Sequence, residues 1–187
     1  GLDEIMALTQ VMGYLYAGHY DVIILDSAPT GHLLRLLELP EIVDQWLKAF
    51  FSLFLKYKRV FRLPKITQQM VQMSKEIKYL RRLLRDPAQN ALFAVTIATE
   101  MAFQETTDLL ASCRRMEVAV PILFVNLVTP PNDCPLCSGL WEAESHLRRK
   151  FKLAFPNIHQ TIIYRHNDPR GLKELEALGK ALYHSAK

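Results

Sequence analysis

The sequence lacks a glycine-rich phosphate-binding loop. That loop needs two glycines, the second followed by Lys and then Ser or Thr, so that backbone N–H groups and one ammonium surround the phosphates. Of the seven glycines only Gly179 precedes a lysine, and Ala181 follows that lysine within a predicted C-terminal helix. The chain also opens at Gly1 without an initiator methionine. We therefore expect a fragment of a longer protein.

Cysteine and long apolar runs are also scarce. Two of the three cysteines form a Cys-x-x-Cys pair, which favours a reducing compartment with metal or redox chemistry over a disulfide framework. No apolar run approaches the roughly 20 residues that cross a bilayer, and no signal-peptide pattern opens the chain. These absences predict a cytoplasmic protein, and they leave peripheral contact with a membrane open.

Charge is concentrated in one stretch of the sequence. The net charge is +4, but residues 56–85 hold ten Lys or Arg and one acid, a local balance of +9. Such a stretch suits an anionic lipid, a nucleic acid or an acidic partner. We favour the simpler interpretation, a solvated face of two helices, and expect no specific nucleic-acid partner.

Along the sequence, short apolar runs typical of buried strands alternate with segments whose apolar residues recur at helical spacing. Buried strands are predicted at 20–25, 91–99, 118–128 and 159–164. Helices are predicted at 3–18, 32–38, 41–61, 66–84, 100–116, 140–152 and 169–183. Pro40 is expected to end the second helix, and leucines 172, 175, 178 and 182 to face inward from the last one.

This order of elements predicts the α/β class: a mainly parallel sheet flanked by helices, with an inserted helical hairpin. We expect residues 1–187 to be the C-terminal portion of one domain. Residues 40–86 would form a helical subdomain inserted within it.

A carboxylate follows the first predicted strand. Four apolar residues, 22–25, lead into Asp26, as in a Walker-B strand whose carboxylate holds the Mg²⁺ shell beside phosphates. The turn at residues 27–32 can present backbone N–H groups to an anion. The bare pattern equally fits an aspartate that caps a helix. Asn126 and the loop 165–169 follow two other strands, and ligands of parallel sheets sit at these carboxyl ends.

The segment "DSAPTGHLLRLLELP" resembles the signature that follows the Walker-B strand in the ArsA family. That family comprises the arsenite-pump-driving ATPases and the targeting ATPases for tail-anchored membrane proteins. Ser27 and Leu33 depart from the usual threonines. Three further segments resemble family elements in the same order: "GLDE", "VNLV" and "DPRGLKELEALG".

The resemblance implies a dimeric, Mg-ATP-dependent P-loop ATPase. It places Asp26 near Mg²⁺ and Asn126 near adenine, and it makes Pro29, Thr30, Gly31 and His32 the switch that senses the γ-phosphate. The strand-end pattern adds Arg165, His166, Asn167 and Asp168 as nucleotide-binding candidates. The family's signature lysines lie N-terminal to anything in this chain, so the chain alone should be catalytically incomplete.

The pair Cys134 and Cys137 supplies two of the four ligands of a structural zinc ion. Two copies meeting at a two-fold axis would complete a Cys₄ site, a plan that some targeting ATPases of the family resemble. The alternative is an empty thiol pair or a redox couple. Cys113, within a helical pattern, is expected to be a buried small hydrophobe.

The predicted helices at 41–61 and 66–84 carry many apolar residues, and their role has two interpretations. They are ordinary core, or they form a groove that accepts an amphipathic or transmembrane helix. The density of Phe in 50–54 exceeds what one stripe can bury and favours an exposed patch or an oligomer contact. The cargo stays open between an arsenite or other anion pump subunit and a hydrophobic client helix. The competing class is a non-catalytic helix-binding or regulatory module with a retired nucleotide site.

Overall fold

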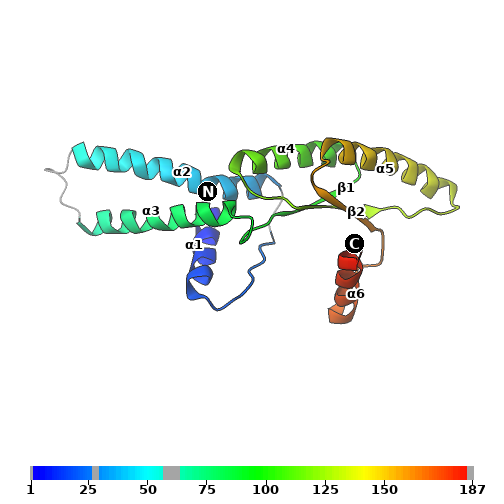
Figure 1. The fold of residues 1–187 in the computed structure, drawn as a ribbon, viewed down its shortest axis with the longest axis horizontal. Coiled ribbons are helices and arrows are strands. Elements are labelled where there is room, and N and C mark those ends of the chain that lie inside the picture. The colour runs from blue at the N-terminus through cyan, green and yellow to red at the C-terminus, as the bar shows by residue number, and fades with distance from the viewer. Residues whose placement is uncertain (1, 27–29, 57–63, 185–187) are drawn as a thin grey trace. The chain divides into compact units, whose positions relative to one another are not determined.

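The computed structural model describes residues 2–26, 30–56 and 64–184. They divide into two compact units, one comprising residues 1–90 and 115–118, the other residues 91–114 and 119–187. The helices and strands of both units are drawn in Figure 1.

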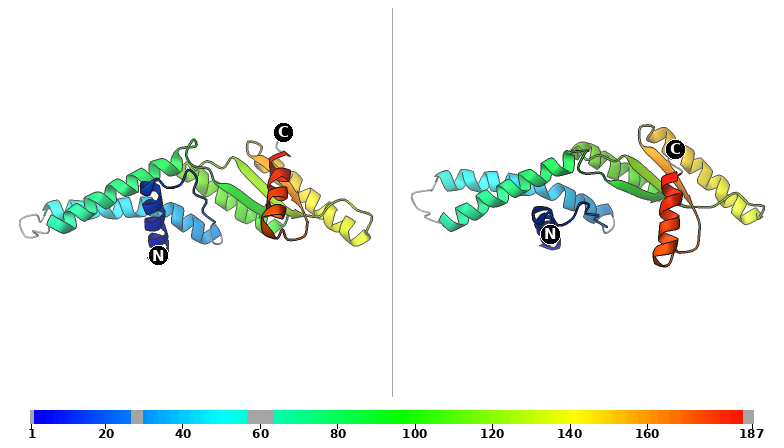
Figure 2. Two further views of the ribbon diagram at one scale, coloured as in Figure 1. Left: turned by 90° about the horizontal axis from the view of Figure 1, so that it is seen from below. Right: turned by 60° about the horizontal axis from the view of Figure 1, so that its bottom comes forward.

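The first unit is helical. Its elements are α1 (Leu2–Ala17), α2 (Thr30–Lys56) and α3 (Pro64–Arg85). The long helices α2 and α3 run side by side in both views of Figure 2, which confirms the predicted hairpin. Leu47 and Leu80, one from each helix, are both 3% exposed and mark its core.

Pro40 does not end a helix. It lies inside α2, with its ring fully buried, so the prediction of a break there is wrong. A proline removes one backbone hydrogen bond from a helix, but burying its apolar ring offsets part of that cost. The predicted continuation to residue 61 enters the segment 57–63, which lies outside the described residues.

The second unit is a layered α/β structure. Three parallel strands, β1 (Phe93–Ile97), β2 (Ile122–Val128) and β3 (His159–Tyr164), form a sheet in the order β1-β2-β3. Three helices accompany them: α4 (Glu100–Met116), α5 (Pro135–Ala154) and α6 (Gly171–His184). The predicted α/β class with a parallel sheet and flanking helices is confirmed. Helix α5 begins at Pro135, with Cys134 as its N-cap, five residues before the predicted start at residue 140.

The core of this unit lies on one face of the sheet. Leu123 and Phe151 are both fully buried, and the ring of Phe103 on α4 meets the Phe151 ring edge-on at 5.0 Å. A second cluster joins Val125 and Leu147. The opposite face of β1 is exposed, because Phe93, Val95 and Ile97 are 55%, 65% and 41% accessible. β1, which was predicted as a buried strand, is thus buried on one face only.

Two further predictions fail. Residues 20–25 form no strand: Val22 and Ile24 are 74% and 87% exposed in a segment without regular secondary structure. A strand is stable only when its backbone groups pair with a neighbour, and the described part of the chain offers this segment none. Similarly, Leu172 and Leu175 on α6 are 86% and 51% exposed, because nothing in the described part of the chain covers them.

Candidate functional site

The carboxyl end of β2 has an irregular backbone. The pairing with β3 shifts between Val125 and Val128, and Leu127 has a φ of 56°. The Asn126 side chain turns back so that its Oδ1 accepts the Leu127 N–H at 2.8 Å. A leucine with positive φ is strained, and such strain is typical of functional sites. The adenine-binding candidate therefore sits on a bulge at the strand end.

The exit of β3 lies beside the exit of β2. The Arg165 backbone N–H donates to the Val128 carbonyl at 2.8 Å, immediately after the last residue pair of the two strands. Arg165 thus stands next to the strand end that carries Asn126, as the sequence predicted. His166, Asn167 and Asp168 follow in an exposed loop, where His166 Nδ1 lies 2.7 Å from the Asn167 carbonyl oxygen.

Glu144 of α5 is a polar residue that the sequence analysis missed. Its side chain is 7% exposed and its oxygens accept hydrogen bonds from the Thr129 N–H at 2.6 Å and the Thr129 hydroxyl at 3.2 Å. The Arg165 guanidinium lies 3.6 Å away. One signal was available, because Glu144 shares the helix face of Leu147 and Phe151, three and seven residues later. An acid on an apolar face needs partners.

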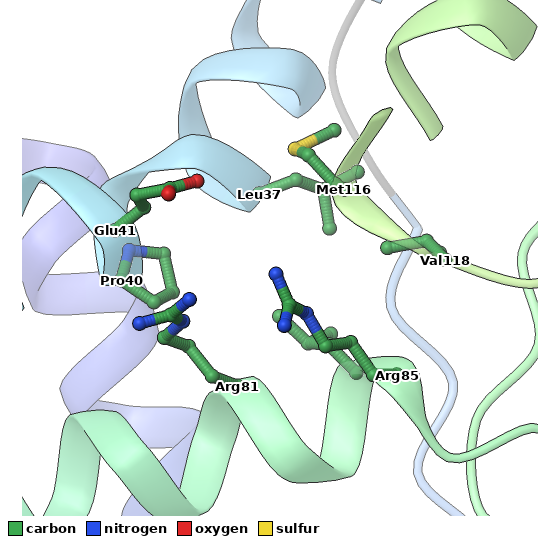
Figure 3. A pocket seen from close by; sticks show the side chains of 8 residues that line it. Leu37, Pro40, Glu41, Arg81, Arg85, Met116 and Val118 are labelled. Atoms are coloured by element: carbon green, nitrogen blue, oxygen red, sulfur yellow. The ribbon is translucent and has the colours of Figure 1, made fainter. Parts of the chain in front are cut away.

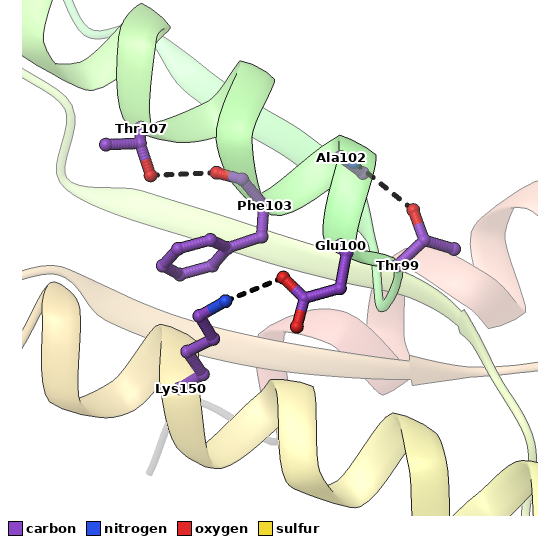
Figure 4. A network of polar contacts seen from close by, with 6 residues as sticks. All are labelled: Thr99, Glu100, Ala102, Phe103, Thr107 and Lys150. Atoms are coloured by element: carbon purple, nitrogen blue, oxygen red, sulfur yellow. Dashed lines mark hydrogen bonds and ion pairs between the residues drawn. The ribbon is translucent and has the colours of Figure 1, made fainter.

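The exit of β1 is fixed by a surface network (Figure 4). The Thr99 hydroxyl accepts the Ala102 N–H at 3.2 Å and so caps the start of α4. Lys150 of α5 donates to Glu100 at 2.6 Å, and its ammonium lies 4.4 Å from the centre of the Phe103 ring. These contacts attach α4 to α5 above the sheet.

Asp26 and the predicted switch belong to the other unit. Asp26 is exposed in a segment without regular secondary structure that precedes α2. Pro29 lies outside the described residues, whereas Thr30, Gly31 and His32 form the first turn of α2. Their predicted approach to the strand ends therefore stays a prediction.

The Cys-x-x-Cys pair opens α5. Cys134 is the N-terminal cap residue and Cys137 lies in the first turn. The Cys137 N–H and thiol and the Leu136 N–H hold the pKa of Cys134 below its usual value. The Cys134 thiol in turn, with burial, raises the pKa of Cys137. The thiolate is the form that binds metals, so the geometry of the pair, and not its ionisation, suits half of a tetrahedral zinc site; the described residues hold no group of three or more metal-binding side chains.

Cys113 behaves as predicted. It is 1% exposed, and burial raises the pKa of its thiol to about 11. It is a neutral core residue.

Two hollows lie away from the strand exits. One, of about 20 Å³, lies in the helical unit; Glu41 and Arg81 are among the side chains around it in Figure 3. That volume holds a water molecule at most. The other, about 670 Å³, is a groove between α5 and β3, lined by residues that include Trp141, Arg148 and His159. His159 begins β3, so the groove extends to the amino end of that strand, opposite to where ligands of parallel sheets bind.

The helical hairpin exposes large apolar side chains. On α2, Ile42, Trp46 and Leu53 are 45%, 76% and 60% accessible, and their spacing places them on one helix face. Val71 and Met73 of α3 are 41% and 47% accessible. None of the helices in the described ranges is long and apolar enough to cross a membrane. The hairpin thus exposes apolar side chains, but Phe50, Phe51 and Phe54, on which the prediction of a patch rested, are half-buried, so that patch stays a prediction.

Comparison with known proteins finds a family model and several similar proteins. The family model "Anion-transporting ATPase" matches residues 1–184. The chain is 34% identical over 154 residues to ATPase GET3B and 35% identical over 155 residues to ATPase GET3C, both of Arabidopsis thaliana. It is 26% identical over 152 residues to the ATPase ASNA1 homolog of Dictyostelium discoideum. Each match covers 74% of this chain but 38%, 40% and 46% of the respective relative. The chain thus spans less than half the length of these relatives.

Proposed function

Because the chain belongs to the anion-transporting ATPase family, the ArsA family that its motifs resemble, we propose that it is the C-terminal portion of one subunit of a dimeric, Mg-ATP-dependent ATPase. The strand exits of β2 and β3 bind the adenine end of the nucleotide. The phosphates are held mainly by polypeptide outside this chain. The observation that carries the proposal is the strained bulge at Asn126, which sits beside Arg165 at the carboxyl end of a parallel sheet.

Exposed apolar surfaces support the proposal that this chain is a portion of a longer subunit. The exposed face of β1 and the apolar residues 22–25 both expose side chains of a kind that folded proteins bury. A further strand beside β1 would give residues 20–25 a sheet to join. Asp26 would then stand at a strand exit, where its carboxylate can hold the Mg²⁺ shell. Thr30, Gly31 and His32, with Pro29, would respond to loss of the γ-phosphate.

Two further parts of the function rest on individual features. Cys134 and Cys137 of two subunits would hold one Zn²⁺ ion in a Cys₄ site at the two-fold axis. The hairpin patch around Trp46 would bind a hydrophobic helix of a membrane-protein client, since flexible and aromatic side chains adapt to varied apolar partners. A pump subunit that docks on the same patch is the competing outcome. The cytoplasm is the proposed location.

Equilibrium binding of ATP tests the nucleotide site. The full-length protein that contains this chain should bind ATP with Mg²⁺, and Asn126→Ala should weaken binding about tenfold through loss of hydrogen bonds to the base. Asn157→Ala, which removes an exposed amide from the turn before β3, is the matched control. Zinc is measured on the same sample and should reach half an ion per subunit. A full-length protein that binds no ATP would instead be the non-catalytic module.

A further inference from the structure

Glu144 sits where a carboxylate is costly. It lies on α5 on the face that carries Leu147 and Phe151, which are 8% and 0% exposed. The side chain of Glu144 is itself 7% exposed. Burial of a charged group destabilises the fold by several kcal/mol unless hydrogen bonds and an opposite charge compensate. A leucine at this position would be the simpler choice for packing.

The partners of Glu144 come from two different strand exits. Thr129, just after β2, donates both its backbone N–H and its hydroxyl, at 2.6 and 3.2 Å. Arg165, just after β3, places its guanidinium 3.6 Å from Oε1. A backbone hydrogen bond from the Arg165 N–H to the Val128 carbonyl also connects these two strand exits directly. One side chain from the covering helix thus joins both loops.

The joined segment includes the strained backbone. Leu127, with its φ of 56°, lies two residues before Thr129, and Asn126 lies next to it. A strained conformation persists only when its surroundings over-determine it. The two hydrogen bonds from Thr129 and the ladder bonds of β2 fix the chain on either side of the bulge.

We propose that Glu144 is a positioning residue of the nucleotide site: it holds the β2 bulge and the β3 exit loop in the arrangement that receives the base. This rests on the proposed function. Because it acts at the base, it sets the affinity for ADP and ATP equally and leaves the phosphate chemistry unchanged. A residue needed only for folding would lower the amount of active protein and leave the affinity of the folded fraction intact.

The test uses the full-length protein with Glu144→Gln and Glu144→Leu. The control is Glu142→Gln, which removes a charge from the same helix at an exposed position. Glutamine keeps an oxygen for the Thr129 N–H but loses the charge that attracts Arg165, so we expect ADP and ATP to bind about threefold more weakly. Leucine loses both contacts, and we expect a loss of about tenfold or more. KM for ATP should rise in parallel while kcat stays within about twofold.

Hydrogen exchange of the nucleotide-free protein provides a readout besides activity. The Thr129 amide should exchange faster in Glu144→Leu, whereas Glu144→Gln should keep it protected and accelerate exchange only in residues 165–168. If Glu144→Leu does not fold, Glu144→Gln alone decides the question, with a predicted loss of about threefold in affinity for both nucleotides.

Three results would overturn the inference. They are unchanged affinity in the folded Glu144 variants, a loss confined to ATP, and a fall in kcat at constant KM. A wild-type protein that binds neither nucleotide would refute the proposed function instead. In that case, if the Thr129 amide exchanged hydrogen at the same rate in Glu144→Leu as in the wild type, the role of Glu144 in holding the two strand exits would be refuted as well.

Discussion

Strand β2 and the segment 20–25 are nearly equal in sequence character and opposite in structure. Both are apolar runs that end at a polar residue, Asn126 in one and Asp26 in the other. In β2, Leu123 and Val125 are fully buried between two neighbouring strands, whereas Ile24 is 87% exposed. An apolar run therefore does not by itself determine burial or pairing: both depend on neighbouring strands, which β2 has and the segment 20–25 lacks within the described part of the chain.

The largest effect expected from this comparison is on stability. Leu123→Ala in β2 should lower the free energy of unfolding of this chain by about 2–5 kcal/mol, because it removes buried methyl groups and leaves a cavity. Ile24→Ala should change it by less than about 0.5 kcal/mol, because the side chain is already in solvent. Urea denaturation followed by circular dichroism measures both.

The same pair of variants tests the missing partner. In the full-length protein, Ile24→Ala should cost about 1–4 kcal/mol, since the proposed neighbouring strand would bury the side chain. An equally small effect in both proteins would mean that the segment 20–25 stays outside the sheet.

A smaller effect is expected in the helical hairpin. The Asp44 carboxylate, 5% exposed, pairs with Lys48 of the same helix at 2.7 Å and with Arg81 of α3 at 3.4 Å. The hydrogen bond from Lys48, followed by the charges of Lys48 and Arg81, holds the pKa of Asp44 below its usual value despite burial. Asp44→Asn should therefore lower the free energy of unfolding by about 1–3 kcal/mol at pH 7.

The pH dependence of this effect has a definite sign. Because the folded-state pKa of Asp44 lies below the unfolded value of about 3.9, its contribution is complete above that pH and disappears as the pH falls through the folded-state pKa. Wild type and Asp44→Asn should thus converge in stability under acid. A difference that does not shrink at all as the pH is lowered into the acid range would contradict the assigned ion pairs.

The smallest effect is expected at the α4–α5 surface. Lys150 and Glu100 are 41% and 66% exposed, so their ion pair is worth about 0.2–1 kcal/mol and weakens with salt. Glu100→Gln should lower the thermal midpoint slightly at low salt and have no effect at 1 M salt. A large decrease in the thermal midpoint that does not depend on salt would contradict the ion pair and indicate a disturbed helix cap at Thr99 instead.

The sequence predicted correctly those elements that have both a clear hydrophobic pattern and packing partners within this chain. Residues 100–116 and 159–164 match their predicted bounds because helix periodicity and sheet neighbours agree there. Pro40 could not be predicted as a helical residue, since its tolerance depends on tertiary burial. Glu144 was missed because its partners, Thr129 and Arg165, are 15 and 21 residues away in sequence, and only the fold brings them together.

Hydrolysis of ATP by the full-length protein tests the central claim most directly. The account predicts Mg-dependent turnover that falls about 100-fold or more in Asp26→Asn, because the amide no longer holds the metal shell beside the phosphates. Glu142→Gln, an exposed acid far along the sequence, should retain wild-type turnover, and the isolated chain should show none. Full turnover in Asp26→Asn, or turnover by the isolated chain that this substitution abolishes, would contradict the account.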